Sequence, residues 1–280
     1  MSRATGGAFD ETTEASWISQ LVALRPGDVV DHFIADGAPS PQGRVFGGLI
    51  AAQALAAAAK TVAADKLPQS LHLYFVRPGV PDTEVAYDVE RTRDGRSFDT
   101  RQVTARQGAD VILEMITSFH RPEPDVDQHR PATLMIGLAD SRAVSGLAEL
   151  GERFELRVAA GRPGLIGPPY WVRSKLPVED DPVIRACALA YLSDLGLMAA
   201  ASPVDITSLR TPIFELGYRA ASIDHAVWFH RAFHPDQWHW FEASSVNNND
   251  SRGLAVGAFF DTEGSRIATV IQEALWRPPR

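Results

Sequence analysis

The positions of apolar and polar residues predict a helix followed by four strands in the first part of the chain. The Ala-rich run from Gly48 to Lys60 contains strong helix formers and no proline, which is typical of a helix. Beyond it, stretches with β-branched, aromatic or alternating residues are separated by turn residues at 93–96 and 107–109, a pattern that indicates β-hairpins. The predicted strands are 70–76, 84–93, 97–106 and 110–120.

The second part of the chain repeats this order. Asp180 and Asp181 precede Pro182, which gives a carboxylate cap and a proline in the first turn, and the predicted helix runs to about Gly196. The strands predicted after it are 223–231, 238–246, 253–260 and 266–276. The intervening residues 123–169 are richer in proline, glycine and charge, and they indicate a linker with a short helix near 141–152.

An internal comparison favours a duplication of one unit. Residues 93–97 align with 249–253 at an offset of 156, and residues 74–77 align with 228–231 at an offset of 154. Carrying the offset of 156 forward superposes Gln272 on Ile116, an apolar residue. Few positions are identical, so chance similarity among β-hairpins stays open as the alternative.

These elements predict an α+β fold, in which a single long helix packs on an antiparallel sheet and the pattern occurs twice. This is the pattern of a double hotdog: two copies of a long helix wrapped by a curved antiparallel sheet. The expected division is an N-terminal hotdog over 1–122, a linker over 123–169 and a C-terminal hotdog over 170–280. No acidic residue occurs from Gly37 to Ala64, the span of the first helix, so we expect one active site per chain.

Composition and charge exclude several classes of protein. The 280 residues are 45% hydrophobic and 22% charged, as in soluble globular proteins, and a net charge of −8 without a Lys and Arg stripe argues against a nucleic-acid partner. A membrane span needs ~20 mostly apolar residues, and the run interpreted as the nearest approach to one, 49–59, is shorter and contains Gln53. Residues 1–14 lack the apolar core of a secretory signal, so we expect a cytoplasmic protein.

Cysteine and histidine usage argues against a metal site. Cys187 is the only cysteine, which excludes an internal disulfide and a cysteine-based zinc cage. Four histidines gather between 225 and 239, but their spacing matches no metal signature. We therefore expect neither a metal nor another cofactor.

Asp194 is an unusual residue in the second predicted helix. It falls on the apolar stripe that includes Cys187 and Tyr191, close to the C-terminal end of the helix, where the helix dipole disfavours negative charge. A buried carboxylate in such a place has a raised pKa and is a candidate general base. An exposed last-turn aspartate bonded to Ser193 or to solvent is the equally weighted alternative, because helix ends vary by one or two residues.

No nucleophile arrangement is evident in the sequence. The chain contains no GxSxG elbow, and Cys187 lies within the helical stripe, which favours a buried thiol. Asp224 and His225 are adjacent, but neighbours on a strand point to opposite faces, so they do not form an acid–base pair and are interpreted as structural. Any hydrolysis would have to activate water directly.

Several segments spread along the chain carry a family likeness. In order they are 44–48 (RVFGG), 71–75 (LHLYF) with 77–79 (RPG), 93–98 (RDGRSF), 193–195 (SDL), 222–225 (SIDH), 228–231 (WFHR) and 270–273 (VIQE). From about Val45 to Arg277, the sequence resembles the acyl-CoA thioesterase II family. This resemblance implies a double hotdog enzyme that hydrolyses fatty acyl-CoA to a free fatty acid and CoA.

The resemblance also implies the residues of the site. An acid, a hydroxyl and an amide hold the attacking water in this family, with no covalent intermediate and no metal. Some relatives have threonine where this chain has Ser222, and either residue supplies the hydroxyl. Alone, Ser222 would be interpreted as a turn cap and Gln272 as a surface amide. The implied catalytic residues are Asp194, Ser222 and Gln272. For substrate binding we expect His72 together with Gly47 and Gly48, since glycines at a helix N-terminus allow backbone N–H groups to approach a developing oxyanion.

Two other functions stay open from the sequence. One is a catalytically silent acyl-CoA-binding hotdog protein, and the other is a hotdog enoyl-CoA hydratase or dehydratase. The presence of an acid, a hydroxyl and an amide argues against a silent protein, and the Asp and His pair of a hydratase loop is not evident. Exposed strand edges favour self-association, so a homodimer or larger homo-oligomer is expected.

Overall fold

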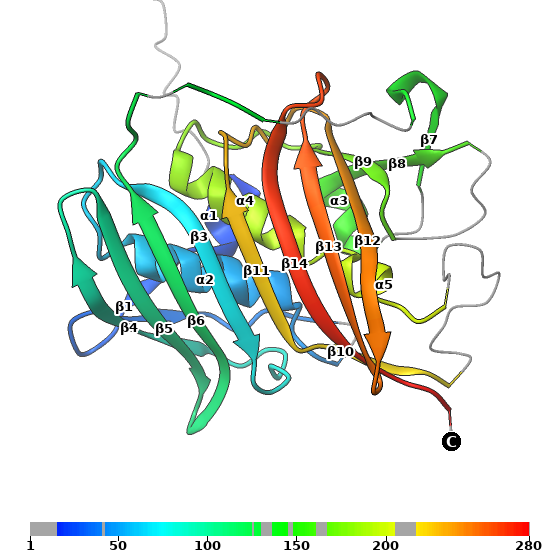
Figure 1. Ribbon diagram of the computed structural model, residues 1–280. Helices are drawn as coiled ribbons and strands as arrows, with labels where there is room; N and C mark the ends of the chain where they lie inside the picture. Colours follow the sequence, from blue (N-terminus) through cyan, green and yellow to red (C-terminus); the bar gives the residue numbers. More distant parts are fainter. Residues whose placement is uncertain are drawn as a thin grey trace, which may run out of the picture.

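A computed structural model describes residues 16–40, 43–124, 126–129, 136–144, 148–160, 167–204 and 217–279. Within these residues, fourteen strands form one antiparallel sheet, and the longer helices lie on one side of it (Figure 1). The order along the sheet is β1-β2-β4-β5-β6-β3-β11-β14-β13-β12-β9-β8-β7, and β10 also pairs with β14. The N-terminal segment judged not to be a secretory signal lies outside the described residues.

The first half of the chain matches the predicted helix and strands closely. Its one long helix, α2, begins at Gly47, and the four predicted strands are present with boundaries shifted by three residues or fewer. Shorter elements precede them. The elements of this half are α1 (Trp17–Leu21), β1 (Arg25–Pro26), β2 (His32–Ala35), α2 (Gly47–Ala59), β3 (Leu67–Phe75), β4 (Val85–Asp94), β5 (Phe98–Gln107) and β6 (Asp110–His120).

The second half has the same order of one long helix followed by strands. The Asp181 side chain accepts hydrogen bonds from the backbone N–H groups of Val183 and Ile184, so it caps the second helix as the sequence predicts. The elements here are α4 (Pro182–Ser193), α5 (Leu197–Ala200), β10 (Arg219–Ser222), β11 (Asp224–Phe229), β12 (His239–Asn249), β13 (Arg252–Phe260) and β14 (Arg266–Arg277).

The segment predicted as a linker also contributes to the sheet. Besides a helix near the predicted place, it contains strands that extend the sheet beyond β12, which the sequence analysis did not anticipate. These strands are short and lie at the sheet edge, where the alternating pattern spans few residues. The elements of this segment are η1 (Leu138–Asp140), β7 (Ser141–Ala143), α3 (Ala148–Arg153) and β8 (Phe154–Ala159). The strand β9 (Tyr170–Ser174), at the start of the predicted C-terminal unit, joins β8 to β12.

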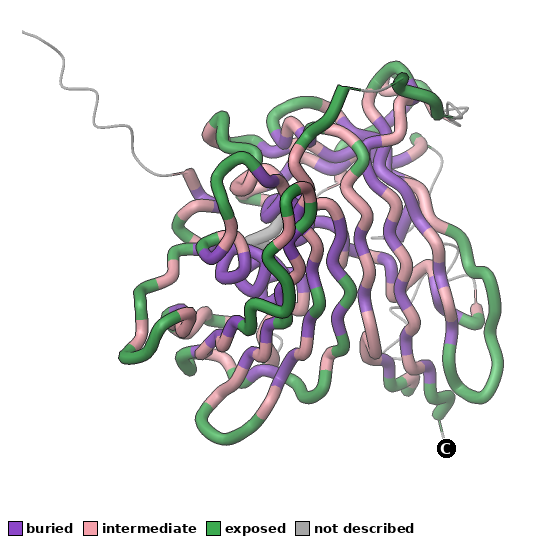
Figure 2. The backbone as a smooth tube through the Cα atoms, turned by 60° about the vertical axis from the view of Figure 1, so that its left-hand side comes forward, coloured by how far each residue is buried: buried purple, intermediate pink, exposed green. Residues whose placement is uncertain are grey.

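The helices α2 and α4 form the centre of the core. They pack against each other, and consecutive residues are buried on every side of both helices, from Gly48 to Ala58 and from Ala186 to Ser193. This explains why α2 consists almost entirely of alanine, leucine and glycine: small side chains allow the second helix and the sheet to approach closely. Along the strands buried and exposed residues alternate (Figure 2), because one sheet face covers the helices.

The two halves of the sheet join at β3 and β11. These strands pair antiparallel, with Leu73 opposite His225 and Leu71 opposite Val227. In the first half β3 pairs with β6, and in the second half β11 pairs with β14. The joint therefore places β3 and β11 in the middle of the sheet, with the two central helices behind them (Figure 1).

The register of the two halves corrects one sequence alignment. Leu73 pairs with Met115 in β6, and its counterpart Val227 pairs with Val270 in β14, so these strands correspond at an offset of 155. Gln272 therefore corresponds to Thr117, which is 1% exposed, and not to Ile116, which is 48% exposed on the outer face. A slip of one residue places a side chain on the opposite face of a sheet.

A further correction concerns the longest apolar helical stretch. By length and composition alone, residues 182–200, covering α4 and α5, are long and apolar enough to cross a membrane, which was not recognised from the sequence. The stretch is interrupted at Gly196, which has a φ of 82°. Its residues from Ala186 to Ser193 are buried against the rest of the protein, so packing in the core accounts for its apolar character.

Candidate active site

Asp194 lies where the ends of the two central helices meet. It is the C-cap of α4, and its Oδ2 accepts a hydrogen bond of 3.0 Å from the backbone N–H of Gly48 in the first turn of α2. The C-terminal end of one helix therefore faces the N-terminal end of the other. The positive end of the α2 dipole offsets the unfavourable end of the α4 dipole. The alternative of an exposed aspartate bonded to Ser193 is wrong.

Burial raises the pKa of Asp194 to about 7, because removal from water disfavours the charged carboxylate. The hydrogen bond from Gly48, a hydrogen bond from the Gln272 side chain and the charge of Arg44 act in the opposite direction and lower the pKa. The balance places the carboxyl group near neutrality. A base of this pKa is ionised in a large fraction of molecules at neutral pH and still accepts a proton readily.

Gln272 connects Asp194 to Ser222. The Gln272 side chain is fully buried, at 0% exposure, on the inner face of β14, so the interpretation as a surface amide is wrong. Its Nε2 donates to Ser222 Oγ at 2.7 Å, and its side chain also hydrogen-bonds to Asp194. Ser222 ends β10 and pairs with Ala274 of β14, which brings the hydroxyl beside the amide. The three predicted catalytic residues therefore lie together.

Both glycines predicted near the site occupy places without room for a side chain. A Cβ on Gly47 would lie 2.8 Å from Asp194 Oδ2, and a Cβ on Gly48 would lie 2.3 Å from the backbone carbonyl oxygen of Tyr191 in α4. Glycine at these positions is what permits the close approach of the two helix ends. The RVFGG segment thus positions the N-terminus of α2 against the acid.

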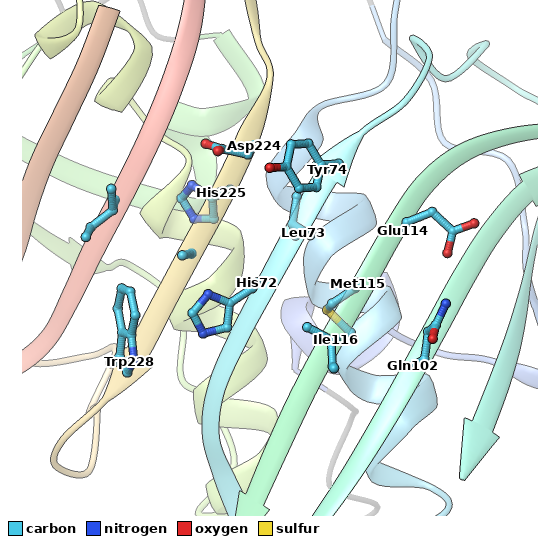
Figure 3. A pocket seen from close by; sticks show the side chains of 12 residues that line it. His72, Leu73, Tyr74, Gln102, Glu114, Met115, Ile116, Asp224, His225 and Trp228 are labelled. Atoms are coloured by element: carbon cyan, nitrogen blue, oxygen red, sulfur yellow. The ribbon is translucent and has the colours of Figure 1, made fainter. Parts of the chain in front are cut away.

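His72 is separated from these residues. It is exposed on β3, and its ring packs edge-on against Trp228 with the centroids 4.9 Å apart. Both side chains line an open depression of about 470 Å³. In Figure 3 they lie on the strands, with the helices behind. The structure therefore places His72 on the outer part of the sheet and does not bring it to Asp194.

His225 is a residue that the sequence analysis interpreted as structural. It is 1% exposed on the inner face of β11, and its Nδ1 lies 2.7 Å from Gln272 Oε1. The adjacent Asp224 instead accepts a hydrogen bond from the backbone N–H of Glu273, so the prediction that the two residues do not form a pair is confirmed. Pairing the last strand with the first strand of its repeat would have revealed the His225–Gln272 contact.

The described residues contain no group of three or more His, Cys, Asp or Glu side chains that could hold a metal ion. Cys187 is a free, buried cysteine in α4, and burial raises the pKa of its thiol. A thiol in that state is a poor nucleophile. The chemistry that the arrangement supports is activation of water by a carboxylate, with an amide and a hydroxyl beside it.

Comparison with known proteins shows the family of this chain. Residues 36–120 match the family description "Acyl-CoA thioesterase N-terminal domain", and residues 164–275 match "Acyl-CoA thioesterase". The chain is 32% identical to acyl-CoA thioesterase 2 of Haemophilus influenzae, over 93% of this chain and 98% of that protein. It is also similar to the crystal structure of acyl-CoA thioesterase II TesB2 from Mycobacterium marinum, with a TM-score of 0.75, 33% identity, and coverage of 94% and 97% of the two chains.

A more distant structure shows the fold by itself. A protein from Alicyclobacillus acidocaldarius, described as having a hot dog fold, matches with a TM-score of 0.71 at 18% identity, over 94% of this chain and 98% of that chain. The large antiparallel sheet with few helices is thus a hotdog-type architecture. Within that class, the chain belongs to the acyl-CoA thioesterase II family.

Proposed function

We propose that this acyl-CoA thioester hydrolase cleaves fatty acyl-CoA to a free fatty acid and CoA with a water molecule activated by Asp194. The observation that carries the proposal is the partly buried carboxyl group of Asp194, whose pKa is raised to about 7, facing an amide that also binds a hydroxyl. The family supplies the substrate class, and the side chains supply the means of activating water without a nucleophile from the protein.

The reaction follows from the positions of these groups. Asp194 takes a proton from water as the water oxygen attacks the thioester carbonyl carbon, and the Gln272 amide and the Ser222 hydroxyl orient that water. The tetrahedral intermediate then collapses, the carbon–sulfur bond breaks, and the proton passes from Asp194 to the departing CoA thiolate. General-base assistance of this kind contributes ~10² to 10⁴ in rate.

The first turn of α2 supplies the groups that stabilise the negative oxygen of the intermediate. Gly47 and Gly48 were both expected to bind substrate. Gly48 instead donates its N–H to Asp194, so we assign it the role of holding the base. The first N–H groups of a helix lack acceptors within the helix, and we assign the oxyanion to the N–H of Gly47.

We interpret the chain as two hotdog units, 1–122 and 170–280, of which only the second carries a site. The two family descriptions divide the chain in a similar place. In the first half, Thr117 and Leu71 occupy the positions of Gln272 and His225, and α2 contains no acid.

We further expect the enzyme to act in the cytosol as a homo-oligomer. Light scattering tests the oligomer, and cell fractionation tests the compartment.

Release of free thiol from acetyl-CoA, decanoyl-CoA and palmitoyl-CoA tests the proposal. We expect hydrolysis, with greater activity on at least one of the two longer substrates than on acetyl-CoA. Binding of palmitoyl-CoA without thiol release would identify a silent binding protein instead. Hydration of an enoyl-CoA without thiol release would identify a hydratase. Either of these results contradicts the proposed function.

A further inference from the structure

A buried chain of hydrogen bonds continues from Gln272 back to helix α4. Gln272 Oε1 lies 2.7 Å from His225 Nδ1, and His225 Nε2 lies 2.8 Å from Ser193 Oγ. Ser193 is fully buried and immediately precedes Asp194. The amide beside the acid is therefore tied, through an imidazole, to the same helix end that carries the acid.

The protons of this chain can be assigned from the chemistry of its members. Burial lowers the pKa of His225 to about 4, so the ring is neutral and carries a single N–H at neutral pH. The ionised carboxylate of Asp194 and the oxygen of Ser222 accept from the Gln272 NH₂ group, which leaves Oε1 facing His225, so Nδ1 of His225 is the protonated nitrogen. Nε2 is then an acceptor, so the single hydroxyl proton of Ser193 is directed to it and not to the backbone carbonyl oxygen of Ala190, which lies 2.9 Å from the same hydroxyl.

This assignment fixes the orientation of the Gln272 amide. With Oε1 held by His225 Nδ1–H, both N–H groups of Nε2 are directed away from His225, toward Ser222 and Asp194. Rotating the amide by half a turn would place its oxygen against the carboxylate and its NH₂ against the N–H of His225. Both contacts would then lack a matching donor and acceptor, which is costly for buried groups.

We propose that His225 is a positioning residue, which holds the Gln272 amide so that its NH₂ group faces Asp194 and Ser222. His225 does not touch the reacting atoms in this assignment. It acts through Gln272, and the inference rests on the proposed function, because an oriented amide matters only if Asp194 and Ser222 act on a water molecule.

The other half of the chain provides an internal comparison. Leu71 and Thr117 hold the positions that correspond to His225 and Gln272. Thr117 donates its hydroxyl proton to the backbone carbonyl of Ser70, and Leu71 is apolar and buried. The same place in the sheet is therefore filled without an imidazole, which indicates that packing of the fold does not by itself require His225.

Substitution of His225 by Leu and by Asn separates positioning from packing. Leu and Asn have a similar branched outline, but only Asn carries a donor, and its Nδ2 is joined to Cα through the same number of bonds as Nδ1 of His. For His225→Leu we expect kcat to fall about 10²-fold, the size of effect that follows a misplaced group, with KM nearly unchanged. For His225→Asn we expect a loss of less than about tenfold, because one hydrogen bond to Gln272 is retained.

Two further variants complete the experiment. In a Gln272→Ala background, His225→Leu should change kcat by no more than about twofold, because its effect passes through the residue already removed. His239 serves as the matched control, because it is also buried, at 2% exposure. Its Nδ1 lies 3.0 Å from the backbone carbonyl oxygen of Gln237, and it takes no part in the hydrogen bonds between Ser193, His225 and Gln272. We expect kcat of His239→Leu to stay within about threefold of the unsubstituted enzyme.

The outcomes distinguish this inference from the proposed function. If the unsubstituted enzyme releases no thiol from acyl-CoA, the proposed function itself fails. If it is active and His225→Leu keeps its kcat, or if His225→Leu causes its full loss in the Gln272→Ala background, the positioning role is wrong. If His225→Leu does not fold, His225→Asn decides between the two outcomes. A loss of kcat as large as that of Gln272→Ala overturns the inference, and a loss of kcat below about tenfold supports it.

Discussion

Replacement of Asp194 by Asn should lower activity and, at alkaline pH, raise stability. Without the base we expect kcat to fall by ~10² to 10⁴. The pKa of Asp194 rises from 3.8 to about 7 on folding, so the ionised carboxylate destabilises the native chain. This cost is absent well below pH 3.8, grows as the pH rises toward 7 and is constant above it. Asn carries no such charge.

The size of the stability effect follows from the shift in pKa. A rise from 3.8 to about 7 corresponds to about 4 kcal/mol in full, of which somewhat under 3 kcal/mol would develop between pH 5 and pH 9. Asp194 is only partly covered, and solvent screening reduces this further. We therefore expect the free energy of unfolding of Asp194→Asn, relative to that of the unsubstituted protein, to increase by about 1 to 2 kcal/mol from pH 5 to pH 9.

Urea unfolding at pH 5, 7 and 9, together with thiol release from acyl-CoA, measures both effects. Asp224→Asn is the matched control. Asp224 lies on β11, next to the strand β14 that carries Gln272, and its Oδ1 accepts a hydrogen bond from the backbone N–H of Glu273, which the side-chain oxygen of Asn can also accept. We expect the control to leave activity unchanged. Full activity in Asp194→Asn would refute its role as base, and a stability difference independent of pH would refute its raised pKa.

Three other predictions follow from the same contacts. The kcat/KM of the enzyme should fall about tenfold per pH unit below about pH 7 and level off above it, because only ionised Asp194 accepts the proton; a flat profile from pH 5 to 8 would contradict this. Gly48→Ala should destabilise the protein by about 1 to 3 kcal/mol in urea unfolding, because its Cβ would lie 2.3 Å from the carbonyl oxygen of Tyr191; unchanged stability would show that the helices separate without cost. Iodoacetamide should leave activity intact at pH 8, since Cys187 is buried and its pKa is raised; rapid inactivation with modification of Cys187 would argue against this.

The long elements of the fold were predictable from local patterns. Alternation of apolar and polar residues marked the eight long strands, and the cap at Asp181 with Pro182 marked the start of α4. The short strands β7 and β8 were not found, because β7 has only three residues and the alternation of β8 covers only six, within a segment whose proline, glycine and charge indicated a linker. Local patterns therefore identify elements that are long enough to repeat their period.

The burial of Asp194 could not be decided from the sequence. The α4 residues from Ala186 to Ser193 are buried on every side, so membership of an apolar stripe did not distinguish an inward residue from an outward one. What decides is the contact with Gly48, which lies 146 residues away in the chain. Only the packing of α2 against α4 brings these two residues together.

The alignment of Gln272 with Ile116 failed for a reason specific to sheets. In both β5–β6 and β13–β14 the register shifts near the turn, and the offset between the halves changes from one strand to the next. An error of one residue places the wrong face inward. The same feature concealed the contact between His225 and Gln272, because it depends on the register of β11 against β14.

A single turnover in ¹⁸O-labelled water most directly tests whether Asp194 activates water for attack on the thioester. With enzyme in excess over acyl-CoA, the fatty acid released in the first turnover should contain one ¹⁸O atom, and the protein should contain none. Unlabelled fatty acid, with ¹⁸O found in the side chain of Asp194, would mean that the carboxylate itself attacks the substrate, and that result would contradict the mechanism.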